Sequence, residues 1–141
     1  MTRNTIALGL LAAFAFTAPT LAQAAQEQFK ATLTTASEVP PKTSDGKGAA
    51  TATLDTSTKT LTYNVTYSGL TGPATAAHIH GPAAIGKNAG VLVPLTPVAT
   101  PIAGTVTLTD AQIADLEAGN TYINVHTAAN PGGEIRGQLT K

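Results

Sequence analysis

Three histidines are the residues in this sequence whose types and spacing could do chemistry. His78 and His80 stand one residue apart in "AAHIHGP", and His126 stands in "TYINVHT". On a β-strand, side chains at i and i+2 leave the same face with their roots about 6 to 7 Å apart. Two imidazoles at that spacing can share a metal ion at about 2.0 Å. Two ligands hold a metal weakly, so a site requires that folding bring His126 to the same surface. Loop 81–90 follows the pair directly and is expected to frame such a site.

The residue composition narrows the choice of metal. The chain has no cysteine, and its single methionine is Met1, so the mature domain offers no soft sulfur ligand for cuprous ion. Calcium and magnesium would require clusters of carboxylates, which the sequence does not show. We therefore predict a metal centre of His78, His80 and His126, with copper as the expected ion and zinc as the alternative. Ring nitrogens that share an ion should converge to within about 3 to 4 Å.

The hydrophobic pattern predicts that these histidines lie on strands of an all-β domain. Alternation of apolar and polar residues is clearest in "KTLTYNVTYSGL" and indicates a half-buried antiparallel strand. Short strands separated by turns are typical of a Greek-key sandwich or barrel. About eight strands are expected, at 28–36, 48–56, 59–70, 74–81, 90–95, 102–108, 121–127 and 133–140.

One segment departs from the strand pattern. In "TDAQIADLEAG", Thr109 precedes Gln112 by three residues, which is the spacing of a capping box, and Gly119 ends the apolar periodicity. The pattern predicts one short helix near 110–118 that bridges two strands.

The first 24 residues are typical of a secretory signal peptide. They combine Arg3, an apolar run from Ile6 to Phe16, and small residues that predict cleavage near Ala24. The apolar run is shorter than the roughly 20 residues that span a bilayer. We therefore expect a signal peptide at 1–24 and one exported domain at 25–141, periplasmic or secreted, with no membrane span.

Charge and motifs exclude several classes of function. Loss of Arg3 leaves seven basic residues against eight acidic ones, so no basic surface is available to bind nucleic acid. The sequence contains no G-x-S-x-G nucleophile motif and no phosphate-binding G-x-x-x-x-G-K-[ST] motif. A conventional hydrolase or nucleotide enzyme is therefore not expected, and no motif indicates a particular protein partner.

Two blocks, "AAHIHGPA" and "YINVHTAANPGGEIRGQL", resemble the signature of the CHRD domain, which is named after chordin and common in exported bacterial proteins. The resemblance extends from Phe29 to Leu139 and includes "ATLTTASEVPP". It implies a β-rich extracellular domain whose biochemical role is poorly defined.

The layout of the histidines is also similar to that of copper-zinc superoxide dismutases, which are Greek-key sandwiches. His78 and His80 match that family's paired copper ligands, and His126 matches its late copper ligand. The bridging histidine, the zinc ligands and the structural cysteines have no counterpart in this sequence. The resemblance therefore implies at most a copper-only site of three histidines.

Alternation in the last strand places Glu134, Arg136 and Gln138 on one face. We interpret this face as solvated and polar, with a pair between Glu134 and Arg136. The alternative is that Glu134 orients a ligand imidazole by a hydrogen bond to the ring nitrogen that does not bind the metal. Arg136 does not match the position of the arginine that guides superoxide in the dismutases, so that role is not assigned to it.

Three functional hypotheses follow. The first is an exported copper-binding protein that sequesters or delivers the ion, or, if it is an enzyme, a superoxide dismutase-like oxidoreductase. The second is a non-enzymatic adhesion or protein-interaction module of the envelope, with Thr-rich contact surfaces and incidental histidines. The third is hydrolysis at a three-histidine zinc ion, which needs an acid or base such as Glu134 or a loop-borne carboxylate.

Overall fold

The structure is a computed structural model that describes residues 25–141, so the expected signal peptide at 1–24 lies outside the described residues. The described chain contains eight strands and one helix. In chain order they are β1 (Gln26–Thr34), β2 (Lys47–Asp55), β3 (Thr60–Ser68), β4 (Ala74–His80), β5 (Val91–Pro94), β6 (Ile102–Thr107), α1 (Asp110–Glu117), β7 (Tyr122–Thr127) and β8 (Ile135–Gln138).

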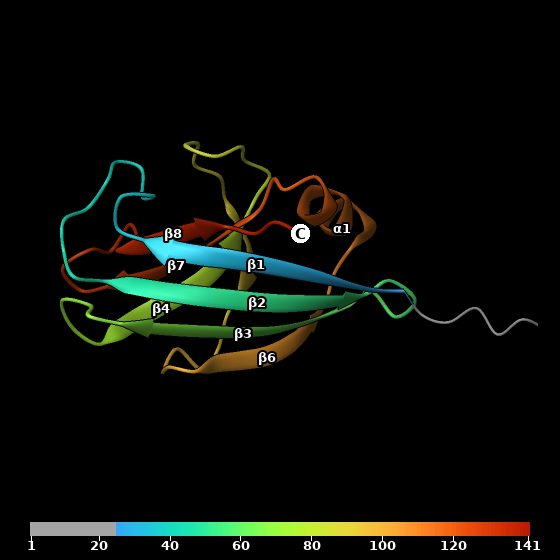
Figure 1. Ribbon diagram of the computed structural model, residues 1–141, viewed down its shortest axis with the longest axis horizontal. Coiled ribbons are helices and arrows are strands. Elements are labelled where there is room, and N and C mark those ends of the chain that lie inside the picture. The colour runs from blue at the N-terminus through green and yellow to red at the C-terminus, as the bar shows by residue number, and fades with distance from the viewer. Residues whose placement is uncertain (1–24) are drawn as a thin grey trace, which may run out of the picture.

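The strands form one antiparallel sheet in the order β5-β4-β7-β8-β1-β2-β3-β6. This sheet bends into a nearly closed sandwich, in which β1, β2, β3 and β6 lie in front of β4 and β7 (Figure 1). Because β3 pairs with β6 and β4 pairs with β7, the connections β3–β4 and β6–β7 join strands that are not neighbours in the sheet. That is the Greek-key arrangement, and it confirms the predicted fold class.

Apolar side chains from both layers meet in a continuous core. Alternate residues along each strand point inward, and the core includes Phe29, Leu33, Leu54, Leu61, Val65, Ile79, Val93, Ile123, Val125 and Ile135, all at most 5 % exposed. Burial of these side chains is the main stabilising contribution in a domain without disulfides.

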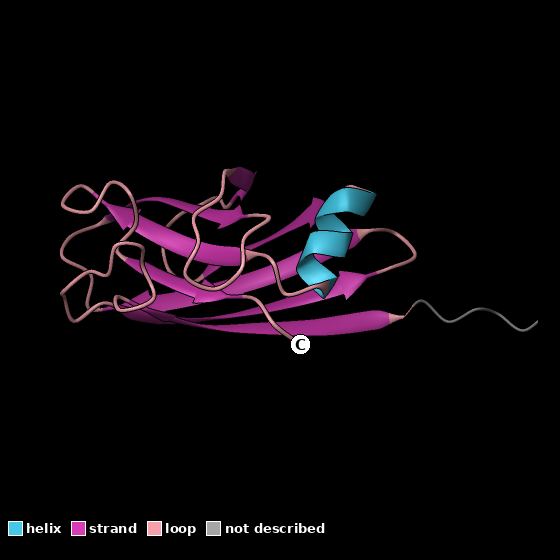
Figure 2. Cartoon of the chain, turned by 90° about the horizontal axis from the view of Figure 1, so that it is seen from above, coloured by secondary structure: helices cyan, strands magenta, loops and turns pink. Residues whose placement is uncertain are grey.

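The predicted helix is confirmed as α1, which packs at one end of the sandwich (Figure 2). The Thr109 side chain accepts a hydrogen bond from the Gln112 backbone, and the Gln112 side chain accepts one from the Thr109 backbone. Gly119 adopts a φ of 71° just after the helix, a conformation that costs glycine little. Within residues 25–141, no helix is long and apolar enough to cross a membrane.

Strand β7 is buried on both of its faces. All six of its residues are buried, although only alternate ones face the core. The other face is covered by loop 81–90, which is held down by contacts with β8: Arg136 donates to Asn88 Oδ1 and to the Lys87 carbonyl, and Gln138 donates to the Ala83 carbonyl. This covered outer face of β4, β7 and β8 carries the histidines.

Candidate metal centre

The pairing of β4 with β7 places all three histidines on one face. His78 lies opposite Asn124, and Ala76 lies opposite His126, so His78 and His126 are diagonal neighbours across the strand pair. Ile79, between the two β4 histidines, points into the core and is 3 % exposed. The expectation that folding gathers the three rings on one surface is therefore met.

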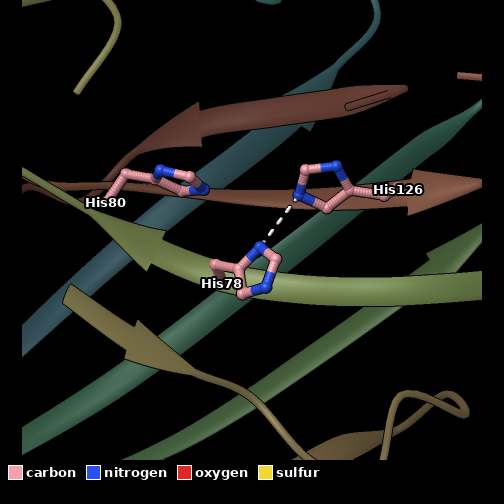
Figure 3. A group of neighbouring side chains, drawn as sticks. All are labelled: His78, His80 and His126. Carbon is pink, nitrogen blue, oxygen red and sulfur yellow. Dashed lines mark hydrogen bonds between the residues drawn. The ribbon is translucent and has the colours of Figure 1, made fainter. Parts of the chain in front are cut away.

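The ring nitrogens converge on a common space (Figure 3). His78 Nδ1 and His126 Nε2 lie 3.0 Å apart, and one ligand nitrogen from each of the three rings lies within 4.8 Å of the others. The 3.0 Å between His78 Nδ1 and His126 Nε2 agrees with the separation of about 3 to 4 Å expected for nitrogens that share an ion, and the limit of 4.8 Å for the whole set is slightly larger. Small side-chain rotations bring such a set onto a single ion, so the residues present fit a three-histidine metal site. Metal binding itself stays a prediction.

Backbone carbonyls fix the orientation of two of the rings. His80 Nδ1 lies 2.9 Å from the Ala89 carbonyl, and His126 Nδ1 lies 2.9 Å from the Pro131 carbonyl. A carbonyl only accepts, so each Nδ1 carries the proton and each neutral ring presents the lone pair of its Nε2. This is the outer support that metal-ligating histidines usually have.

Burial also keeps two of the imidazoles neutral. It is the largest cause that lowers the pKa of His78 and His126 below the ordinary 6.5, and the neighbouring imidazoles lower both further. At His126 the hydrogen bond to the Pro131 carbonyl opposes this effect. Both rings are therefore neutral at pH 7, which is the form that binds a metal.

Aromatic stacking also holds the His80 ring. The His80 ring is parallel to the Tyr122 ring with the centroids 4.8 Å apart. The Arg136 guanidinium lies 3.4 Å from the centroid of the same Tyr122 ring, at a distance typical of a cation–π contact. Arg136 is 2 % exposed, so it is part of the wall of the site and not of a solvated surface.

The prediction of a solvated Glu134–Arg136 pair is wrong. Glu134 is fully buried, and within residues 25–141 no ion pair joins it to Arg136. Its carboxylate accepts hydrogen bonds from the side chains of Ser44, Thr71, Thr127 and Asn130 and from the Thr71 backbone. The alternative, that Glu134 orients an imidazole directly, is not seen either, because backbone carbonyls take that role.

Burial by itself would raise the pKa of Glu134, but the hydrogen bonds from Thr127, Thr71 and Ser44 outweigh it and lower the pKa to about 2. A carboxylate with that pKa is a poor proton acceptor near neutral pH. Glu134 is therefore unsuited to the role of general base that the zinc-hydrolysis hypothesis would give it.

Two residues of the site were not predicted. Asn124 lies between the histidines, with its Oδ1 3.0 Å from His80 Nε2 and 2.9 Å from His126 Nε2. The only sequence signal was its position two residues before His126, on the same strand face. Glu38 comes from the loop between β1 and β2 and is 4 % exposed; no local pattern distinguishes it from a solvated loop acid.

Glu38 provides a test of this buried environment. Burial raises its pKa to about 7, although the nearby Arg136 acts in the opposite direction. Between pH 4.5 and 7 the folded protein then holds a proton that the unfolded chain releases, so stability falls as the pH rises. From pH 5 to pH 7 this amounts to about 2 kcal/mol of unfolding free energy. Urea unfolding at both pH values should show that the wild type loses this amount relative to Glu38→Gln, since other titrating groups contribute equally to both proteins, and equal pH dependence would contradict it.

The fold and the site together define an eight-stranded Greek-key β-sandwich with a covered cluster of three histidines on its outer face. Residues 29–139 match the family model of the CHRD domain, and the chain belongs to this family. The matched range confirms the resemblance seen in the sequence. No curated protein and no solved structure matches the chain.

Proposed function

We propose that this CHRD-domain protein is an exported copper-binding protein, with His78, His80 and His126 as ligands. The observation that carries the proposal is the convergence of three ring nitrogens within 4.8 Å, two of the rings being oriented by backbone carbonyls. An all-imidazole nitrogen set suits copper or zinc. His78 is the most exposed of the three histidines, which leaves the ion a path to solvent for exchange or for a redox reaction resembling that of superoxide dismutases.

The direct test is a copper titration of the purified protein, followed by calorimetry and by electron paramagnetic resonance. We expect one cupric ion per chain, with nitrogen hyperfine structure from the imidazoles. The absence of uptake, or a spectrum without coupled nitrogens, would refute the proposal. Superoxide consumption by the loaded protein would then separate redox activity from sequestration or delivery.

The pH dependence of binding provides a second test. Protons compete with copper for the imidazoles, and burial lowers the pKa of His78 and His126 below 6.5. Protons therefore compete less strongly here than at exposed histidines, and copper should be retained below pH 6.5 and released only on further acidification. A pH titration of the cupric absorption band measures the midpoint. Release that is half complete above pH 6.5 would contradict this prediction.

The proposal of export rests on the signal-peptide pattern of residues 1–24. Sequencing the N-terminus of the protein from a periplasmic or secreted fraction should identify Ala25 as its first residue. If the protein is instead an adhesion or protein-interaction module with incidental histidines, replacing His78 and His80 together by Ala will leave its cellular phenotype intact.

A further inference from the structure

Asn124 occupies the centre of the outer face. It lies opposite His78 on β4 and opposite Arg136 on β8, and His126 follows it by two residues on β7. Asn124 is 2 % exposed. A buried amide in this position needs partners for its oxygen and for its nitrogen.

The oxygen of this amide is close to two nitrogens that have no proton to offer. Each Nδ1 of His80 and His126 donates to a carbonyl, so in the neutral rings each Nε2 is a lone pair. Asn124 Oδ1 lies 3.0 and 2.9 Å from these Nε2 atoms. Two neighbouring ligand atoms bound to one ion at about 2.0 Å, at the 90° angle of tetragonal geometry, lie about 2.8 Å apart. The spacing is therefore close to that of donor atoms that share a cation.

The surroundings of the amide favour the orientation with the oxygen toward the histidines. A Cβ added at Gly133 would overlap both Glu38 Oε1 and Asn124 Nδ2, so these two atoms lie against the same α-carbon. Glu38 Oε1 is buried and has no hydrogen-bond partner in the described chain. A carboxyl oxygen can accept from the N–H groups of an amide, so the position of Glu38 Oε1 on the Nδ2 side of Asn124 fits Oδ1 facing the two Nε2 atoms.

Resting on the copper site proposed above, we propose that the amide oxygen of Asn124 is a fourth ligand, which makes the centre select cupric over cuprous ion. Oxygen is a hard donor that contributes little to the binding of soft Cu(I), whereas Cu(II) accepts mixed nitrogen and oxygen sets in tetragonal geometry. The three imidazoles serve both oxidation states. Asn124 therefore sets the preference between them.

The test compares the affinities of Cu(II) and Cu(I) in competition with chelators, the second under anaerobic reducing conditions. Asn124→Ala should weaken Cu(II) binding by about 10- to 100-fold, as loss of a weak ligand or close partner does, and should leave Cu(I) binding unchanged. Asn124→Asp retains an oxygen and adds charge, so its ratio of Cu(II) to Cu(I) affinity should exceed that of the wild type. Asn64→Ala, on the exposed face of β3, is the matched control and should change neither affinity.

Two results would overturn this inference alone. If Asn124→Ala weakens both oxidation states equally, Asn124 only positions the imidazoles, and if it weakens neither, the amide is no ligand. If Asn124→Ala does not fold, Asn124→Asp provides the test: a ratio of Cu(II) to Cu(I) affinity equal to that of the wild type would contradict ligation by the oxygen at this position. A wild-type protein that binds neither ion refutes the copper site itself and this inference with it.

Discussion

Replacing His126 by Ala is expected to weaken copper binding by at least about 100-fold. Structural zinc sites in small peptides bind with roughly 12 kcal/mol shared among four ligands, or about 3 kcal/mol for each, and a loss of that size here corresponds to a factor of 100 or more. His126 has the most connected position of the three, since its Nε2 contacts both His78 Nδ1 and Asn124 Oδ1. The cupric dissociation constant, measured by chelator competition, checks the prediction.

Loss of the fold would produce the same result, so the metal-free variant must be shown to fold. His126 lies on the outer face of β7 and not in the apolar core, so thermal unfolding of His126→Ala without metal should remain a single cooperative transition. Asn64→Ala, on the exposed face of β3 and away from the histidines, is the control and should bind copper like the wild type. Copper binding by His126→Ala as tight as in the wild type would place the ion elsewhere on the chain.

The alternation of the sequence was sufficient to predict which side chains share a face. Strand periodicity put His78 and His80 on one side of β4 and His126 on one side of β7, because the side-chain period of a strand is two. For the three histidines to meet, β4 and β7 also had to pair with each other, and in the structure they do. The helix was equally predictable, because the signals of its capping box are local in the sequence.

Burial of the outer face could not be predicted in this way. A polar residue at every second position indicates a solvent-facing side, and by that rule Glu134 and Arg136 should be solvated. In the folded protein the loops around Glu38 and Asn88 cover this face, and Asn88 Nδ2 donates to the Val39 carbonyl to join them. This cover depends on contacts between segments that are distant in the sequence. No local sequence pattern therefore predicts that Arg136 is buried or that Glu38 lies beside the site.

The ends of the strands were also less predictable than their existence. The last strand was expected from residue 133 but begins at Ile135. Gly133 has a φ of 122°, so the extended backbone of the strand cannot include it. Because glycine has no Cβ, the backbone at this residue lies close to Glu38 and Asn124. Hydrophobic alternation contains no information on such a turn.

The second large effect is expected at Glu134, whose substitution by Gln should cost about 3 kcal/mol of unfolding free energy at pH 7. The pKa of its carboxyl falls from 4.5 to about 2 on folding. A lowered pKa stabilises the folded state above pH 4.5, and this contribution is lost as the pH falls from 4.5 toward 2. Urea unfolding should show that the loss of stability between pH 4.5 and pH 2 is larger in the wild type than in Glu134→Gln by about this amount.

Glu134→Gln should also weaken copper binding, by about 10-fold, although Glu134 contacts none of the three histidines. Its carboxylate accepts from Thr127 and Asn130, at the two ends of the turn that presents the Pro131 carbonyl to His126 Nδ1. Without these hydrogen bonds the turn is less rigid, so the His126 ring is held less firmly in the orientation that points its Nε2 at the other ligands. Ser57→Ala, which removes an equally local hydroxyl–carboxylate bond to Asp55 on the exposed turn after β2, should leave copper affinity unchanged. Equal affinities for wild type and Glu134→Gln would show that the turn keeps its shape without the carboxylate, and that Glu134 serves stability alone.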